Sequence, residues 1–537
     1  MLMPQAKAIS FVFSNTPLHS LLKAITRSFS CLFKCLPDHF ISRKKLFSFL
    51  HDRYNYLPNS RQTVQEITLP HSKAKAKLVI NNLEAEISSL LNDPRILEED
   101  YLFFGNNPMN PPPANINYVG DLNTGRAYLE THKRLITPGT NQVLLPVLFY
   151  IDGANTGHFA DLPITAVKFT FGIFTRKARD KEHMWRILGY VPAVSKHKSR
   201  GRRILIDSQH VDSVMAHQDA LEDEGQLEAT SVCKAQDLHT MLSVILADYV
   251  KLQSTGFYWE LPYKNQVHKI RFVMFTPFFK VDGDEAEKIC GKYTTRTGNV
   301  KQLCRYCKCP TPLSDRTLLQ FEAKTPQEIE ALRINDDDEG LKNLSQQKII
   351  NAAYALRFGK HNNTGVHGAC PMEMLHAINL GIFRYIRDCF FEQVGATSKL
   401  ADTINGYSRE YGALFSRQSD RNFPKTKFAN GIRRGKLMAK EYPGILLCMA
   451  VVLTSTGGSN ELRQHKPSVF GQTGVIEDWK MLVVTLLQWE MWLKKDVMEK
   501  HHVQRARRKH RYLMYLIKEV GKRMVGGRMP DAFQLFG

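Results

Sequence analysis

Two long apolar runs, each leading directly into acidic residues, constrain the fold of this chain most. Residues 143–151 (VLLPVLFYI) precede Asp152. Residues 270–281 (IRFVMFTPFFKV) precede Asp282 and Asp284. A nearly continuous apolar run of this kind is typical of a strand that is covered on both faces. The two runs therefore predict two buried strands with carboxylates where the chain leaves them.

The remaining pattern adds more strands and many helices. Partial alternation of apolar residues predicts strands at 164–175 and 186–194. Apolar residues at helical spacing predict helices at 18–35, 40–52, 73–92, 234–252, 373–394, 434–453 and 475–520, with a charged, mostly helical stretch at 315–356. The fold class expected from this mixture is α+β (mixed α/β).

These elements divide the chain into five expected parts. They are a basic helical N-terminal region (1–92), a linker and entry loop (93–142), a sheet core with a CxxC motif (143–314), a helical insertion (315–432) and a helical C-terminal part with a basic helix (433–537). The loop is expected because its prolines exclude both a helix interior and a central strand.

The charge of the chain points to a polyanionic partner. The 537 residues include 73 Lys and Arg against 52 Asp and Glu, a formal net charge of +21. Such an excess favours nucleic acid first and an anionic membrane surface second. No stretch reaches the roughly 18 apolar residues that a membrane span needs. The first 37 residues contain no Asp or Glu, which also resembles an organelle transit peptide.

The acids at the strand ends are candidate metal ligands. Carboxylates on neighbouring strands can share divalent cations such as Mg²⁺, which binds a few carboxylate oxygens and keeps some waters. Two such ions can activate a nucleophile and stabilise a leaving oxygen. The alternative is structural, because Asp is also common where strands give way to turns.

The cysteines indicate a second kind of metal site. Three of the ten cysteines lie in a CxxCxC motif, at Cys304, Cys307 and Cys309. A CxxC pair is suited to gripping one Zn²⁺, which then needs two more ligands. The candidates for these are Cys309, His361, His367, Cys370 and His376. The alternatives are a free thiol pair and a redox CxxC.

Two further residues are ambiguous by themselves. Glu441 lies near the start of a predicted buried helix, where it is either a third metal ligand or a favourable N-terminal charge. His376 on a partly apolar helix is a packing residue unless it completes the zinc site.

The order of these residues resembles a known family. The series Asp152, Asp284, CxxC, Leu375-His376 and Glu441 is similar to the catalytic domain of cut-and-paste DNA transposases of the CACTA and related superfamily, including the Plavaka-type elements. Longer stretches also resemble this group, among them FYIDGANTGHFADLPITAVKFTFGIFTRKARDKEHMWRILGYVP and GDEAEKICGKYTTRTGNVKQLCRYCKCPTP. The resemblance covers roughly residues 90–500.

The resemblance implies a DDE/D triad on an RNase H-like core, with a zinc-pinned, mainly helical insertion. Asp152, Asp284 and Glu441 would be the catalytic ligands of Mg²⁺ or Mn²⁺, with Asp282 and Glu373 as fallbacks. The structural zinc would be held by Cys304, Cys307 and His376, with Cys309, His367 or Cys370 as the fourth ligand.

The function implied is metal-dependent DNA cleavage and strand transfer at transposon ends, in the nucleus. The expected partners are DNA and, as an open alternative, further copies of the chain, with no membrane partner. A non-catalytic, domesticated or decayed transposase that only binds DNA remains the alternative. The sequence shows no convincing DNA-binding zinc finger near its N-terminus, and it ends soon after the helical segment. Both features are also expected of a truncated or decayed copy of a transposable element.

Overall fold

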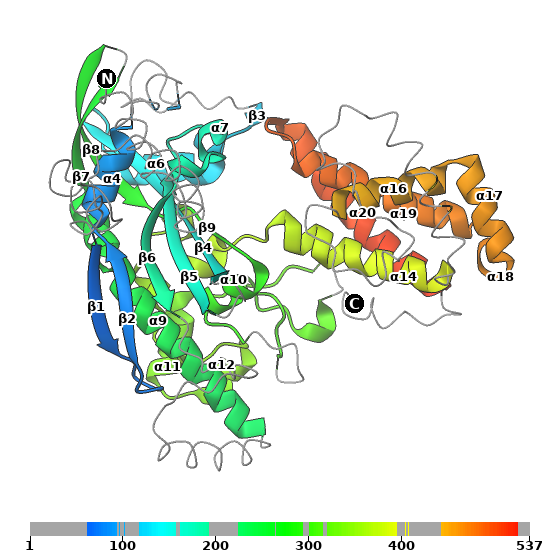
Figure 1. Ribbon diagram of the computed structural model, residues 1–537, viewed down its shortest axis with the longest axis horizontal. Coiled ribbons are helices and arrows are strands. Elements are labelled where there is room, and N and C mark those ends of the chain that lie inside the picture. The colour runs from blue at the N-terminus through cyan, green and yellow to red at the C-terminus, as the bar shows by residue number, and fades with distance from the viewer. Residues whose placement is uncertain are drawn as a thin grey trace, which may run out of the picture. The chain divides into compact units, whose positions relative to one another are not determined.

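The structure is a computed structural model, and it describes most of the chain from residue 62 onward. The described residues are 62–93, 96, 101–102, 117–156, 162–192, 224–263, 265–293, 300–314, 319–394, 403, 406 and 442–524. They belong to two units (Figure 1). The first unit comprises residues 1–112, 127–279 and 349–362, and the second comprises 113–126, 280–348 and 363–537. The helices predicted at 18–35 and 40–52 lie outside the described residues.

A mixed sheet forms the first unit. Its strands are β1 (Gln62–Thr68), β2 (Lys75–Asn81), β4 (Gln142–Thr156), β5 (Leu162–Phe171), β6 (Arg186–Pro192), β7 (Phe257–Tyr263) and β8 (Gln266–Phe275), in the order β1-β2-β6-β5-β4-β8-β7. The short β9 (Phe279–Val281) also pairs with β4. β4 and β8 run parallel, whereas β4, β5 and β6 form an antiparallel meander. With the helices, this sheet makes the chain a mixed α+β protein, as predicted.

The central strand β4 comes from the first apolar run. Residues 143–149 are all buried, so the strand is covered on both faces, as the sequence predicted. The predicted strands at 164–175 and 186–194 correspond to β5 and β6. Asp152, however, does not end β4. The strand continues to Thr156, because Asp152 still pairs with Ala166 in the ladder with β5.

The long helix α9 (Glu224–Thr255) packs on the sheet, where it contacts β2, β6 and β8 (Figure 1). It includes the helix predicted at 234–252. The Tyr249 ring meets the Phe149 ring of β4 edge-on, with centroids 4.9 Å apart. The Tyr249 hydroxyl and the Thr276 hydroxyl form a buried hydrogen bond of 2.9 Å. The apolar stripe of the helix and the apolar run of β4 therefore form one core.

The prediction of a single helix at 73–92 is wrong in its first half. Residues 75–81 form β2, and only α4 (Leu83–Leu91) is helical. Ala76 and Leu78 are buried while the lysines beside them are exposed, which is the two-residue period of a strand. The helix begins after Asn82, whose side chain accepts a hydrogen bond from the Ala85 amide. The described part of the N-terminal region is therefore a strand hairpin with one helix.

The second apolar run is a strand with a break. β8 ends at Phe275 and β9 begins at Phe279. Pro277 has no amide hydrogen to give to a ladder. The Thr276 amide donates instead to the carbonyl of Arg357 at 2.8 Å. The second apolar run therefore forms two separate strands, β8 and β9, which both pair with β4.

Helices dominate the second unit. A π-helical segment (Leu375–Phe383, η9) continues into α14 (Arg384–Val394), and together they match the helix predicted at 373–394. They share an apolar core with α16 (Tyr442–Thr454), α17 (Thr456–His465), α18 (Pro467–Phe470), α19 (Val475–Leu493) and α20 (Lys500–Met524) (Figure 1). At the centre of this core the fully buried Trp479 meets Phe390 edge-on, with ring centroids 5.1 Å apart.

Two predicted helices differ at their ends. The helix predicted at 434–453 is described only from Tyr442 onward, as α16. The stretch predicted as helical at 475–520 is interrupted by β10 (Met498–Glu499), which pairs with β3 (Tyr118–Val119). A polar segment between α19 and α20 thus leaves the helix to form a strand bridge.

Shorter elements complete the described chain. They are η3 (Leu122–Thr124), α6 (Arg126–Leu135), α7 (Arg176–Arg179), η4 (Glu182–Met184), α10 (Gly283–Ile289), η6 (Thr311–Leu313), α11 (Pro326–Ile334), α12 (Asp338–Asn343), η7 (Ala352–Ala355), η8 (Gly359–His361) and α13 (Gly365–Ala369). The stretch predicted as mostly helical at 315–356 is therefore helical only in part.

Within the part of the chain that the structure describes, no single helix has both the length and the apolar character needed to cross a membrane. One pair, α16 with α17, meets that criterion only when taken together across a bend of 83°.

The contact between β4 and α9 predicts a large effect for Phe149→Ala. Phe149 is 1 % exposed, so its truncation leaves a cavity and should lower the free energy of unfolding by about 3–5 kcal/mol. Val64→Ala is the matched control, since Val64 lies on β1 with 67 % of its surface exposed and should change stability by no more than about 0.5 kcal/mol. Urea unfolding of the purified variants measures both. Equal stability of the two variants would contradict this account of the core.

Candidate functional site

Asp152 is held in a defined orientation on β4. Its carboxylate is partly buried, and its Oδ2 accepts a hydrogen bond of 2.6 Å from the Tyr150 hydroxyl. Tyr150 is two residues earlier on the strand and so projects from the same face. The ring of Tyr150 in turn contacts Trp185, with centroids 6.0 Å apart. Sequence reasoning did not single out Tyr150, although the two-residue spacing was a usable signal.

The two candidate acids after β9 have different surroundings. Asp282 is the N-cap of α10, and its Oδ1 accepts the Glu285 amide at 2.7 Å. This contact gives Asp282 a structural role. Asp284 is exposed in the first turn of the same helix. A carboxylate there also favours the helix N-terminus, so its position is compatible with either a structural or a metal-binding role.

Two phenylalanines of the first unit show how the two acid-bearing segments run. β4 and β8 are parallel, with Gln142 opposite Arg271. Further along, the Phe149 and Phe279 rings stack with centroids 5.5 Å apart. Along the sequence, Asp152 comes three residues after Phe149, and Asp282 comes three residues after Phe279. β4 and β8 thus run in the same direction, and the Phe149 and Phe279 rings are in contact.

The candidates for the third acid are not equivalent. Glu441 lies outside the described residues. Glu373, the fallback, accepts a hydrogen bond of 2.7 Å from the His376 amide and also pairs with the His376 ring. The structure therefore places Glu373 beside the candidate zinc ligand His376, which is 41 % exposed at the start of η9.

The CxxC motif forms a tight turn. The Cys307 amide lies 3.4 Å from the Cys304 sulfur and donates to it. Burial raises the pKa of the Cys307 thiol to about 11, and the neighbouring Cys304 adds to that shift. Beneath the turn, the buried Lys324 ammonium donates to the carbonyls of Cys304 at 2.9 Å and Leu344 at 2.8 Å. Burial lowers the pKa of Lys324 to about 8. Lys324 was not recognised from the sequence, where it looks like any charged surface residue.

The candidate fourth ligands His367 and Cys370 are buried near a cysteine that sequence reasoning passed over. Cys290, at the end of α10, is fully buried, and its sulfur contacts the Val366 carbonyl at 3.8 Å. A hydrogen bond between Cys290 and Cys370 holds the pKa of Cys290 well below its usual range and raises that of Cys370. His367 also lowers the pKa of Cys290.

This thiol pair is linked to the CxxC turn through Arg305, whose Nε donates to the Cys370 carbonyl at 2.9 Å. No spacing in the sequence signals the pairing of Cys290 with Cys370, because the two lie far apart along the chain. Only the packing of α10 against the α13 segment brings them together. The structure thus gathers more cysteines around the motif than the sequence alone indicated.

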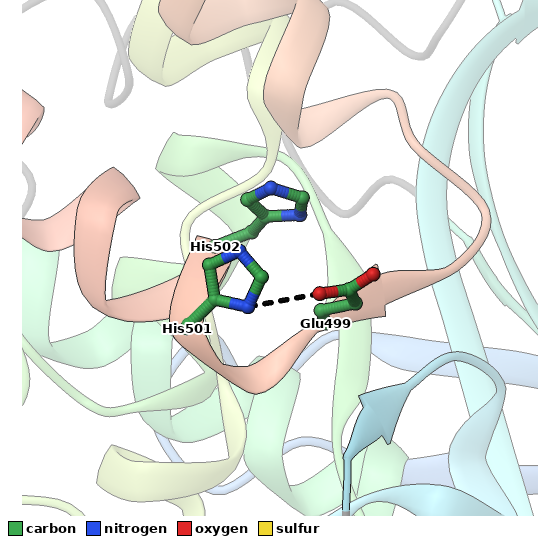
Figure 2. Close-up of side chains that lie close together, drawn as sticks. All are labelled: Glu499, His501 and His502. Carbon is green, nitrogen blue, oxygen red and sulfur yellow. Dashed lines mark ion pairs between the residues drawn. The ribbon is translucent and has the colours of Figure 1, made fainter.

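One set of three metal-ligand side chains converges in the part of the chain that the structure describes. It consists of Glu499, His501 and His502, whose ligand atoms all lie within 4.8 Å of one another (Figure 2). Cys304, Cys307 and His376 do not meet this criterion among the described residues. His361 was a further candidate, and burial lowers its pKa. The predicted zinc and magnesium ligands therefore stay predictions.

Models of protein families give no match to this chain, and no curated protein matches it.

The environment of Cys307 predicts the pH dependence of its reactivity. Only the thiolate is alkylated, and the pKa near 11 keeps Cys307 protonated at neutral pH. With metal removed by a chelator, alkylation by iodoacetamide should accelerate about tenfold per pH unit from pH 7 to 10. A cysteine in an unstructured peptide should level off above its ordinary pKa of about 8.5. Peptide mass spectrometry measures both rates, and a plateau for Cys307 near pH 8.5 would contradict the raised pKa.

Proposed function

We propose that this protein is a DNA transposase-like enzyme that cleaves DNA and transfers strands at transposon ends. The observation that supports the proposal is the parallel pairing of β4, the strand that contains Asp152, with β8, and the stacking of Phe149 on Phe279. The chain continues from Phe279 to Asp282 and then to Asp284, the proposed second acid. An antiparallel meander (β4, β5, β6) is followed by helix α9, the edge strand β7, and then β8, which is parallel to β4. This order is compatible with the RNase H-like core that the resemblance implies, with β7 as an additional strand.

The catalytic carboxylates in this proposal are Asp152, Asp284 and Glu441, with Asp282 and Glu373 as fallbacks. Carboxylate oxygens suit Mg²⁺ or Mn²⁺, which would activate a nucleophilic oxygen and stabilise the leaving oxygen at phosphorus. The chain's own contribution is positioning. The Tyr150 hydroxyl donates to Oδ2 of Asp152 and so limits the orientations of that carboxylate. The acids also require cations before the phosphate backbone can approach them, because like charges repel.

A structural zinc is part of the same proposal, with Cys304, Cys307 and His376 as ligands and Cys309, His367 or Cys370 as the fourth. The soft sulfur donors and the amide-to-sulfur contact in the CxxC turn suit Zn²⁺. Glu373 pairs with Nδ1 of His376, and a zinc ion would take the other ring nitrogen, Nε2. The zinc would have a structural role.

DNA is the proposed partner, and the nucleus the proposed location. Helix α20 carries an exposed stripe of basic and aromatic side chains, namely Arg505, Arg508, Tyr512 and Tyr515. Their spacing of three or four residues puts them on one face of the helix. The Tyr512 and Tyr515 rings stack at 6.4 Å. Guanidinium groups bind phosphates, and exposed aromatic rings stack on bases.

The same stripe favours a second candidate function, a non-catalytic DNA-binding protein descended from a transposase. Binding through α20 does not require Asp152 or Asp284, so a copy that has lost cleavage would keep it. The two candidates differ in one measurable property, the metal-dependent cutting of DNA.

The catalytic proposal predicts the effect of Asp152→Asn. This change removes the charge that would hold a cation and should lower Mn²⁺-dependent cleavage of labelled element-end DNA by at least about 10³-fold. Asp248→Asn is the matched control, since Asp248 is exposed on α9 and its loss should leave cleavage unchanged. Tyr150→Phe should lower the rate less, because it only frees the Asp152 side chain.

Gel analysis of the cut and joined products, with DNA affinity measured in parallel, separates the outcomes. Cleavage that survives in Asp152→Asn overturns the assignment of this carboxylate. DNA binding without cleavage in the unchanged protein supports the non-catalytic alternative.

The DNA interface predicts a change in salt dependence. Each phosphate contact contributes about 0.9 to the slope of log K against log salt. Arg508→Ala should therefore reduce that slope by about 1, while Lys251→Ala, an equal charge change at an exposed position of α9, should leave it unchanged. Fluorescence anisotropy at several salt concentrations gives both slopes, and equal slopes for the two variants would remove α20 from the interface.

A further inference from the structure

We propose that Glu499, His501 and His502 form a second transition-metal site, selective for Zn²⁺ or a similar ion, where β10 meets α20. The site is independent of the CxxC motif and of the acids on β4 and α10. Neither the sequence pattern nor the proposed function assigns a role to these three residues. Figure 2 shows the His501 imidazole facing the Glu499 carboxylate, with the His502 imidazole beside it.

The geometry is close to what one ion requires. The Glu499 Oε2 lies 2.9 Å from the His501 Nδ1, and the two imidazole centroids are 4.1 Å apart. Ligand atoms bound to one tetrahedral Zn²⁺ at its usual bond lengths are separated by roughly 3.3 Å. All ligand atoms of the cluster already lie within 4.8 Å, so small side-chain rotations would complete the site.

The surrounding structure fixes the three residues relative to one another. Glu499 pairs with Tyr118 in the bridge between β10 and β3, and the next amide, of Lys500, donates to the Asn117 carbonyl at 2.9 Å. His501 and His502 follow in the first turn of α20. The His502 ring packs near Trp492 at the end of α19, with centroids 6.4 Å apart. The backbone of the site is therefore set by a strand bridge and a helix start.

The donor set determines which metal fits. Two neutral imidazoles with one carboxylate suit Zn²⁺, Cu²⁺ and Ni²⁺, whereas Mg²⁺ and Ca²⁺ prefer oxygen ligands alone. His501 is 58 % exposed and Glu499 is 40 % exposed, so water completes the coordination. The exposed Lys500 and the positive end of α20 oppose a cation here, and the Glu499 carboxylate offsets them.

The test compares the zinc content of variants of the full chain. The unchanged protein, the double variant His501→Ala/His502→Ala and the control His465→Ala are equilibrated with micromolar free zinc and freed of unbound metal. His465 is a matched control because it also pairs with a glutamate, Glu461, at 3.2 Å. Among the described residues, however, His465 and Glu461 do not belong to a group of three metal-ligand side chains. The double variant should hold one zinc fewer per chain, and the control should hold as many as the unchanged protein.

Histidine modification provides a second, residue-level measurement. Zinc should protect His501 and His502 from acylation by diethyl pyrocarbonate, Mg²⁺ should not, and His465 should be modified equally under all conditions. Circular dichroism verifies that the variants fold. Equal zinc content in the double variant and the unchanged protein, or protection that needs millimolar zinc, overturns the proposal. Loss of zinc through Cys304→Ser alone leaves this site intact and tests only the CxxC proposal.

Discussion

The parallel pairing of β4 with β8 is the constraint on which the first unit depends. It places two apolar runs, more than a hundred residues apart in sequence, side by side in one sheet. The core forms around these strands, because Tyr249 of α9 packs against the Phe149 ring and Phe279 stacks on that ring as well. Burial of these aromatic rings contributes far more stability than any exposed ion pair of the unit.

The candidate sites differ in the local structure that holds their polar side chains. Asp152 lies inside a strand, so its orientation is set by the sheet and by Tyr150. Asp282 and Asp284 lie at a helix start, where carboxylates have a structural use of their own. In the second unit, a buried lysine and a buried arginine hold the CxxC turn and the Cys290–Cys370 pair through backbone carbonyls. Burying a charged side chain costs free energy, and these hydrogen bonds offset part of that cost.

Much of the fold was predictable where one period dominated the sequence. The apolar run of β4 is short, as a buried strand is, and the apolar residues of α9 repeat at the helical period, so the sequence favoured one local structure in each case. Residues 73–92 were mispredicted because a strand and a helix follow one another there with only Asn82 between them. The site was less predictable: the CxxC turn was visible from spacing, but Cys290 and Lys324 become neighbours of it only through packing.

The sequence by itself determined the mixed fold class, the two apolar strand segments and the chemistry available in the acids, thiols and basic helix. These depend on side-chain type and short-range period, which any local segment carries. Only the tertiary structure decided that β8 lies parallel to β4, that Tyr249 of α9 packs on Phe149, and that Cys290 meets Cys370. Contacts such as these depend on which distant surfaces bury one another and where a helix starts, and no local pattern encodes that choice.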